Sequence, residues 1–177
     1  MGVEIGFAGW VHTYAQAIHL GGDTTAAALN ATFWGSFLLG RMVAVGVATR
    51  MGSGRMLGVA GALSIGAAAV LALSSGRAAP VWAGTVLFGV AIAPLYPTML
   101  AYVGDHFPLT GSATSWFVAG SAIGGLTLPW MIGQLFDHLG PSAMPVTVLV
   151  ATVCCMAWIL VIRATLTHRP RPSHPNW

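Results

Sequence analysis

Polar and aromatic side chains recur along this chain at the spacing of helix faces, in combinations that suit the binding of a polar solute. At about 100° per residue, Asn30, Trp34 and Arg41 fall on one face of a helix. Amide and hydroxyl groups exchange hydrogen bonds with hydroxyl-bearing solutes, and tryptophan rings offer flat apolar surfaces. The alternative is that these side chains make hydrogen bonds between the helices of a packed bundle. Our candidates for a solute pathway are His12, Gln16, Asn30, Trp34, Tyr96, Trp116, Thr127, Trp130 and Gln134.

The residue patterns of the common enzyme classes are missing from the sequence. It has no glycine-rich phosphate loop, no serine nucleophile elbow and no carboxylate pair at catalytic spacing. His12 and His19 do not have the spacing of the HExxH zinc helix, and no cysteine or carboxylate completes a set of metal ligands. We therefore expect no enzyme activity, no cofactor and no metal site.

Two charged residues, Glu4 and Arg41, fall inside apolar segments and are candidates for ion coupling. Ionisable groups within membrane helices are costly and mark ion or substrate paths. Burial disfavours the charged form of a carboxylate, which suits a group that binds and releases a proton. The alternatives are a Glu4 solvated by lipid headgroups and an Arg41 that serves as a structural anchor.

The segments that carry these residues are predicted to be membrane-spanning helices, because charged residues make up only 6% of the chain. Soluble domains contain about 25% charged residues. A helix needs about 20 apolar residues to cross a hydrocarbon layer of about 30 Å. The sequence therefore predicts an all-α polytopic membrane protein with six spans, at about 1–19, 26–49, 56–74, 81–104, 111–135 and 144–166.

Arginine is concentrated on one side of the predicted bundle, and this bias sets the orientation. Six spans place both termini on the same side as the second and fourth loops. The opposite side carries Arg77 as its only arginine. The first side carries Arg50, Arg55, Arg163, Arg169 and Arg171. Because positively charged loops stay in the cytoplasm, both termini are predicted to be cytoplasmic, and the net charge of +3 does not indicate nucleic-acid binding.

The fourth predicted span contains two prolines, Pro94 and Pro97, with Tyr96 between them. Each proline removes a backbone donor and opposes a straight helix. Irregular backbone at membrane depth is tolerated where it is buried or lines a cavity, and transporters bind substrates and ions at discontinuous helices. The alternative is a kink that only shapes helix packing.

One loop resembles the cytoplasmic loop signature of the major facilitator superfamily. The loop reads GVATRMGSGRML, and the matching residues are Gly46, Arg50, Gly52 and Arg55. Thr49 stands where the signature has an acidic residue, so the resemblance carries no charge-relay role to this loop.

Three longer segments narrow the resemblance within that superfamily. They read GVEIGFAGWVHTYA (2–15), LYPTMLAY (95–102) and TGSATSWFVAGSAIGGLTLPWMIGQLFDHLGP (110–141). All three are similar to the second half of bacterial members near the branch of the sodium-dependent glucose transporters and the L-fucose–proton symporters. The segment 110–141 is the most specific of the three.

The resemblance implies that residues 1–166 are helices seven to twelve of a twelve-helix carrier, built from two inverted repeats of three helices. It implies a secondary active transporter of a bacterial cytoplasmic (inner) membrane, which carries a sugar or similar small polar solute, with cation symport as one mode of coupling. The alternatives are an exporter of drugs or metabolites and a non-transporting membrane module that binds a partner protein. The proline-rich segment 167–177 is predicted to be a disordered cytoplasmic tail.

The expected partners, besides the lipid bilayer and the solute, follow from this implied architecture. Transporters of this kind bind their substrate between two halves, and six helices form only one wall of that path. We therefore expect an N-terminal six-helix half or a second copy of the chain as a partner. Met1 falls inside the first predicted span, which favours a missing first half.

Overall fold

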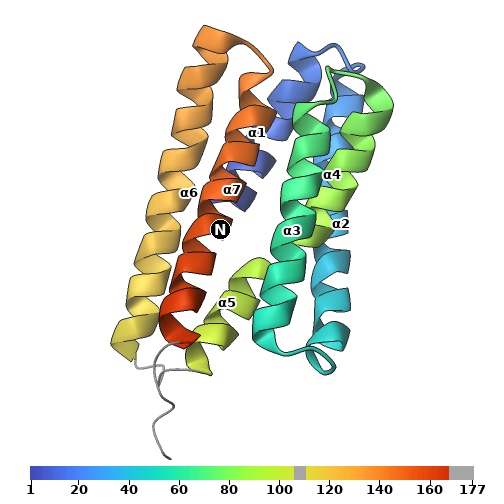
Figure 1. Cartoon of the computed structure of the whole chain (residues 1–177). Coiled ribbons are helices and arrows are strands. Elements are labelled where there is room, and N and C mark those ends of the chain that lie inside the picture. The colour runs from blue at the N-terminus through green and yellow to red at the C-terminus, as the bar shows by residue number, and fades with distance from the viewer. Residues whose placement is uncertain (106–110, 168–177) are drawn as a thin grey trace, which may run out of the picture.

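The computed structural model describes residues 1–105 and 111–167, and these residues are mostly helical (Figure 1). The helices are α1 (Gly2–Ala17), α2 (Asp23–Ala48), α3 (Ser53–Ala72), α4 (Ala78–Ile92), α5 (Leu95–Gly104), α6 (Gly111–Leu139) and α7 (Ala143–Thr167). Since the described residues form no β-strand, the all-α fold class predicted from the sequence is confirmed. The predicted disordered tail, from residue 168 onward, and its two arginines lie outside the described residues.

Five helical segments of the described chain are long and apolar enough to cross a membrane. They are Asp23–Ala48, Ser53–Ala72, Ala78–Gly104, Ser115–Leu139 and Ala143–Thr165. The third of these joins α4 and α5 into one span. With 16 residues, α1 reaches only about 24 Å, which is less than the hydrocarbon thickness of about 30 Å. The helices support a polytopic membrane protein, while the sixth span stays a prediction.

The short helix α1 joins two groups of helices in the bundle. It packs against α6 and α7 in one group and against α2 in the other. The second group is centred on α4, which packs against both α2 and α3, while α3 also contacts α5 and α7. Figure 1 shows α6 and α7 side by side at the left, with α3 and α4 at the right. By contrast, α2 and α3 make few direct contacts with each other.

Glycine permits the closest helix approaches in the bundle. A Cβ atom built on Gly40 of α2 would lie 2.6 Å from the main-chain oxygen of Val90 in α4. A Cβ atom on Gly2 of α1 would lie 2.8 Å from the main-chain oxygen of Gly124 in α6. Neither position has room for a side chain, because real Cβ contacts are not this short. Small residues of this kind let backbones pack closely in lipid, where packing drives helix association.

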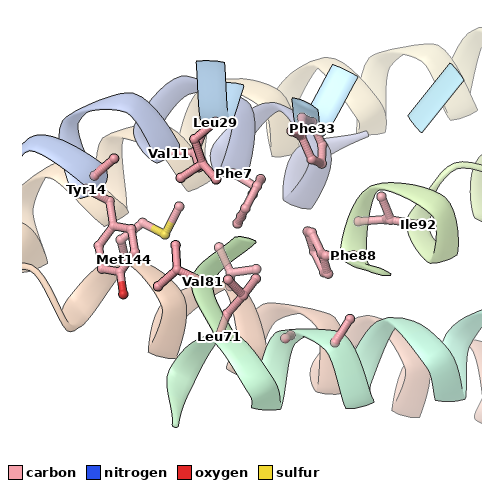
Figure 2. Close-up of a cluster of buried hydrophobic side chains, with 14 of the residues drawn as sticks. Phe7, Val11, Tyr14, Leu29, Phe33, Leu71, Val81, Phe88, Ile92 and Met144 are labelled. Carbon is pink, nitrogen blue, oxygen red and sulfur yellow. The ribbon is translucent and has the colours of Figure 1, made fainter. Parts of the chain in front are cut away.

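A buried aromatic cluster fixes α1, α2 and α4 relative to one another (Figure 2). The ring centroid of Phe7 lies 4.8 Å from that of Phe33 and 5.0 Å from that of Phe88. The rings of Phe33 and Phe88 are 6.5 Å apart. These separations are typical of favourable aromatic pairs. The cluster thus sets the register of the two helices, α1 and α2, that carry the charged candidates Glu4 and Arg41.

Candidate functional site

His12 and Gln16, both candidates for the solute pathway, lie together at the connection between α1 and α2. Gln16 donates a hydrogen bond from Nε2 to Oδ1 of Asp23 at 2.8 Å. His12 Nε2 lies 3.2 Å from the same oxygen. Asp23 is the first residue of α2, so its carboxylate also faces the positive end of that helix dipole. The two side chains therefore bind a protein carboxylate in this structure and join the ends of two helices.

The candidates on α2 combine an exposed indole with buried polar atoms. Trp34 is exposed, and its ring contacts those of Phe33 and Phe37 edge-on, with centroid distances of 5.4 Å and 5.7 Å. One turn earlier along the helix, Asn30 has a buried Oδ1 without a hydrogen-bond partner among the described residues. An unpaired buried carbonyl costs free energy. The carbonyl oxygen of Asn30 therefore has hydrogen-bonding capacity that no described residue uses, and neighbouring atoms cover it in this structure.

Arg41, which lies further toward the C-terminal end of α2, also has hydrogen-bonding capacity that no described residue uses. Its Nε is buried and has no hydrogen-bond partner among the described residues. Its guanidinium carbon lies 5.0 Å from the centroid of the Phe37 ring, within the range of a cation–π contact. The contact with Phe37 holds the charge in place and leaves donors available to an oxygen of a solute or of a carboxylate.

Glu4 is a buried carboxylate on α1, with 7% of its surface exposed. The positive charge of Arg41 acts on it, and the amine of Met1 lies 4.0 Å from its Oε2. The two coupling candidates are carried by two helices in contact, α1 and α2, and they form no ion pair with each other. A change in the charge of either group alters the field at the other.

The candidates on α6 share one exposed surface but do not form a compact site. Trp116, Thr127, Trp130 and Gln134 are all exposed, and the Thr127 hydroxyl donates to the Ile123 oxygen within its own helix at 2.8 Å. The helix rises 1.5 Å per residue, so Trp116 and Gln134 are about 27 Å apart. A small solute cannot touch both ends. The α6 stripe can line a path across the membrane, and only part of it can contact a solute at one time.

The fourth span is interrupted where the two prolines occur in the sequence. The helix α4 ends at Ile92, and α5 begins at Leu95. Pro94 is buried, and its missing N–H leaves the Val90 oxygen, which lies against Gly40, without its usual partner in the helix. Pro97 falls inside α5 and is exposed. Tyr96 is partly buried between them.

The four residues of the loop signature, Gly46, Arg50, Gly52 and Arg55, are all exposed around the connection between α2 and α3. Two contacts lie at this end of the bundle, and the sequence analysis did not identify either of them. Ser53 Oγ donates to Oδ2 of Asp105 at 2.6 Å, which joins the start of α3 to the end of α5.

The second contact lies at the same end of the bundle. The guanidinium carbon of Arg163 in α7 lies 5.9 Å from the Tyr102 ring centroid in α5. The sequence offers one signal for this pair of contacts: Arg163 was predicted to lie on the same side of the membrane as the second and fourth loops.

The family sequence model of the Major Facilitator Superfamily matches residues 2–177 of this chain. The chain belongs to this superfamily. The loop at Gly46–Arg55 and the interrupted span at Pro94 are therefore features of a superfamily member, and the assignment made from the loop signature is confirmed. No solved structure matches the chain.

The chain is similar to curated proteins of this superfamily, two of which are named as transporters. The sodium-dependent glucose transporter 1 of Danio rerio is 30% identical over 155 residues, which are 86% of this chain and 26% of the relative. The sodium-dependent glucose transporter 1A of Mus musculus is 30% identical over 78% of the chain and 32% of the relative. The major facilitator superfamily domain-containing protein 4A of Homo sapiens is 27% identical over 99% of the chain and 34% of the relative. The chain thus spans about a quarter to a third of the length of these relatives.

Proposed function

We propose that this chain forms one six-helix half of a secondary active transporter for a sugar or similar small polar solute. The observation that carries the proposal is the superfamily match over residues 2–177. The names of relatives such as the sodium-dependent glucose transporter 1 of Danio rerio support the sugar class and a coupled cation. The proposal assigns binding and conformational change to the chain, and no catalytic step.

The solute-contacting surface in this proposal combines exposed aromatic and amide groups on α2 and α6 with the partly buried side chain of Asn30. Trp34 and Trp130 offer flat faces on which a sugar ring can stack. Asn30, with its unpartnered Oδ1, and the exposed Gln134 exchange hydrogen bonds with solute hydroxyls. Because these groups lie at different depths, the solute contacts subsets of them as it moves.

Ion coupling is assigned to Glu4, with Arg41 as its counter-charge. A buried carboxylate is expensive when ionised, and proton or cation binding removes most of that cost. The charge of Arg41 acts on this carboxylate, so occupancy of Glu4 changes the field at α2. This arrangement connects cation binding to the helix that carries the solute-contacting Trp34.

The six helices are proposed to work with a second wall. The exposed polar and aromatic surface of α2 and α6 contains Trp34, Trp116 and Gln134, and such groups are costly when they face hydrocarbon. An N-terminal six-helix half is the proposed cover, and a second copy of the chain is the alternative. Both termini are proposed to lie on the cytoplasmic side of a bacterial inner membrane, because the loop that carries Arg50 and Arg55 lies at the end of the bundle where α7 ends (Figure 1).

Transport by the full-length protein in liposomes tests the proposal. Labelled hexoses are presented with an inward sodium gradient, an inward proton gradient or neither. Accumulation that depends on one gradient is the expected result. Gradient-driven flux of other solutes, without uptake of any hexose, would contradict the sugar class and favour the alternative of an exporter of drugs or metabolites. No flux of any solute would make the chain an interaction module. Reporter fusions near Arg77 and at residue 177 test the orientation, and an active cytoplasmic reporter at Arg77 would contradict it.

A further inference from the structure

An open apolar groove runs along the bundle between α2 and α3, with α4 as its floor. Its volume is about 410 Å³, within the range of pockets that bind small ligands. Val43 and Val47 of α2 face Val59 and Leu63 of α3 across it. None of the solute-pathway candidates lines this groove. It is therefore a feature of the fold that the proposed transport function does not use.

The length of the groove along α3 matches the thickness of one leaflet of a bilayer. Its lining on α3 runs from Met56 to Ala67, which is about 16 Å along the helix. Half of a hydrocarbon layer of about 30 Å is about 15 Å. A groove of this depth accommodates a chain that enters from one surface and ends near the midplane. A transmembrane helix of a partner protein would need a contact surface that continues through both leaflets.

Two arginines are sequence neighbours of residues that line the groove at the end nearest the α2–α3 connection. Arg50 precedes Met51 and Arg55 precedes Met56, and both methionines line the groove. Both arginines are exposed, and neither belongs to an ion pair of the described residues. A guanidinium group presents several donors in one plane and matches the geometry of a phosphate. The groove therefore combines an apolar slot with an anion-binding mouth at the level of the lipid headgroups.

We propose that this groove binds one acyl chain of an anionic phospholipid, whose phosphate is held by Arg50 and Arg55. The acyl chain of the lipid fills the space between α2 and α3, two helices that make few direct contacts with each other. Each basic residue near the headgroups adds a preference of roughly fivefold for anionic over zwitterionic lipid. The lipid thus acts as a packing element of the bundle, whichever solute the protein carries.

Photolabelling of the full-length protein in phosphatidylcholine vesicles tests this site. The vesicles contain a small fraction of phosphatidylglycerol with a photoreactive diazirine on one acyl chain. In the matched experiment the same diazirine chain is carried by phosphatidylcholine. We expect the phosphatidylglycerol probe to label groove residues between Val43 and Leu63 several-fold more than the phosphatidylcholine probe. The double variant Arg50→Gln/Arg55→Gln should lose this preference and keep its fold, because both side chains are exposed.

A second variant tests the acyl-chain part of the groove. A Cβ atom on Gly66 meets no atom within 4 Å, and Gly66 lines the groove. Gly66→Leu should therefore fill the groove without moving the backbone and should reduce labelling by the phosphatidylglycerol probe several-fold. Gly35→Leu is the matched control, because Gly35 is equally open but lies outside the groove.

Three results would overturn the proposal. The first is equal labelling by the two probes, since the headgroup would then have no influence. The second is unchanged labelling in Arg50→Gln/Arg55→Gln or in a folded Gly66→Leu variant. The third is crosslinking of the groove to a partner protein in place of lipid, which would make it a helix-binding surface.

Discussion

The indole nitrogen of Trp10 in α1 donates a hydrogen bond to the main-chain oxygen of Pro129 in α6 at 2.9 Å. The same indole covers Gly133, where a Cβ atom would lie only 2.8 Å from Cζ2 of Trp10. A polar contact and a close packing contact thus join the two helices at one point. Because α1 is short, we infer that these two contacts contribute a large part of the interaction that holds it against the exposed helix α6.

Replacing Trp10 with phenylalanine should weaken the attachment of α1 to α6. The variant loses the hydrogen bond to Pro129, at a cost of about 1 kcal/mol or less in a membrane protein, and it also loses part of the packing on Gly133. Unfolding in mixed micelles measures the change in stability. Far-ultraviolet circular dichroism follows the loss of helix, so the readout does not depend on tryptophan fluorescence. Trp158→Phe is the control, because Trp158 is 68% exposed on α7. Equal effects of the two substitutions would contradict the role assigned to Trp10.

The helical membrane fold was predictable, whereas the contact of Trp10 with Pro129 was not. Apolar length and scarcity of charge are properties of each local segment, so they identify membrane helices directly. The contact joins residues that are 119 positions apart, and helix periodicity carries no information about which helices are neighbours. The resemblance to a superfamily supplied the arrangement that the local patterns could not.

The role of the candidate site in solute binding stays a prediction, and only the positions of its residues can be compared with the structure. Periodicity identified the stripe from Trp116 to Gln134, and these residues are indeed exposed together. The same reasoning could not reveal that His12 and Gln16 bind Asp23, because loop geometry decides that contact. Nor could it predict that Arg41 lies on the Phe37 ring, which depends on the rotamer of a long side chain.

The close contact between α2 and α4 predicts opposite effects for alanine at two glycines of α2. Gly40→Ala places a methyl group 2.6 Å from the Val90 oxygen, so the helices must separate. Overpacking of this kind costs about 1–3 kcal/mol. In Gly35→Ala the new Cβ meets no atom within 4 Å, and the variant should gain up to about 1 kcal/mol from helix propensity. Thermal unfolding in detergent compares the two, and equal stability would show that the helices separate without cost.

The buried carboxylate of Glu4 predicts an effect on coupling in the full-length protein. Glu4→Gln keeps the size of the side chain and removes its ability to exchange a proton. We expect the dependence of solute flux on pH to weaken while solute exchange without a gradient persists. Proteoliposome assays across a range of pH measure both. Asp137→Asn, at an exposed carboxylate near the end of α6, is the control. Unchanged pH dependence in Glu4→Gln would leave Glu4 a structural or sodium-linked role.

The solute pathway predicts that two equally exposed tryptophans differ in function. Trp130 on α6 and Trp158 on α7 are both 68% exposed, but only Trp130 lies on the stripe with Thr127 and Gln134. If a sugar ring packs on Trp130 about as strongly as a second aromatic ring would, Trp130→Ala should cost about 0.5–1.5 kcal/mol of binding. That cost is roughly a two- to tenfold rise in the solute concentration for half-maximal flux. Trp158→Ala should leave that concentration unchanged, because Trp158 lies on α7, outside the proposed solute-contacting surface of α2 and α6. A larger effect of Trp158→Ala than of Trp130→Ala in the proteoliposome assay would move the solute path away from α6.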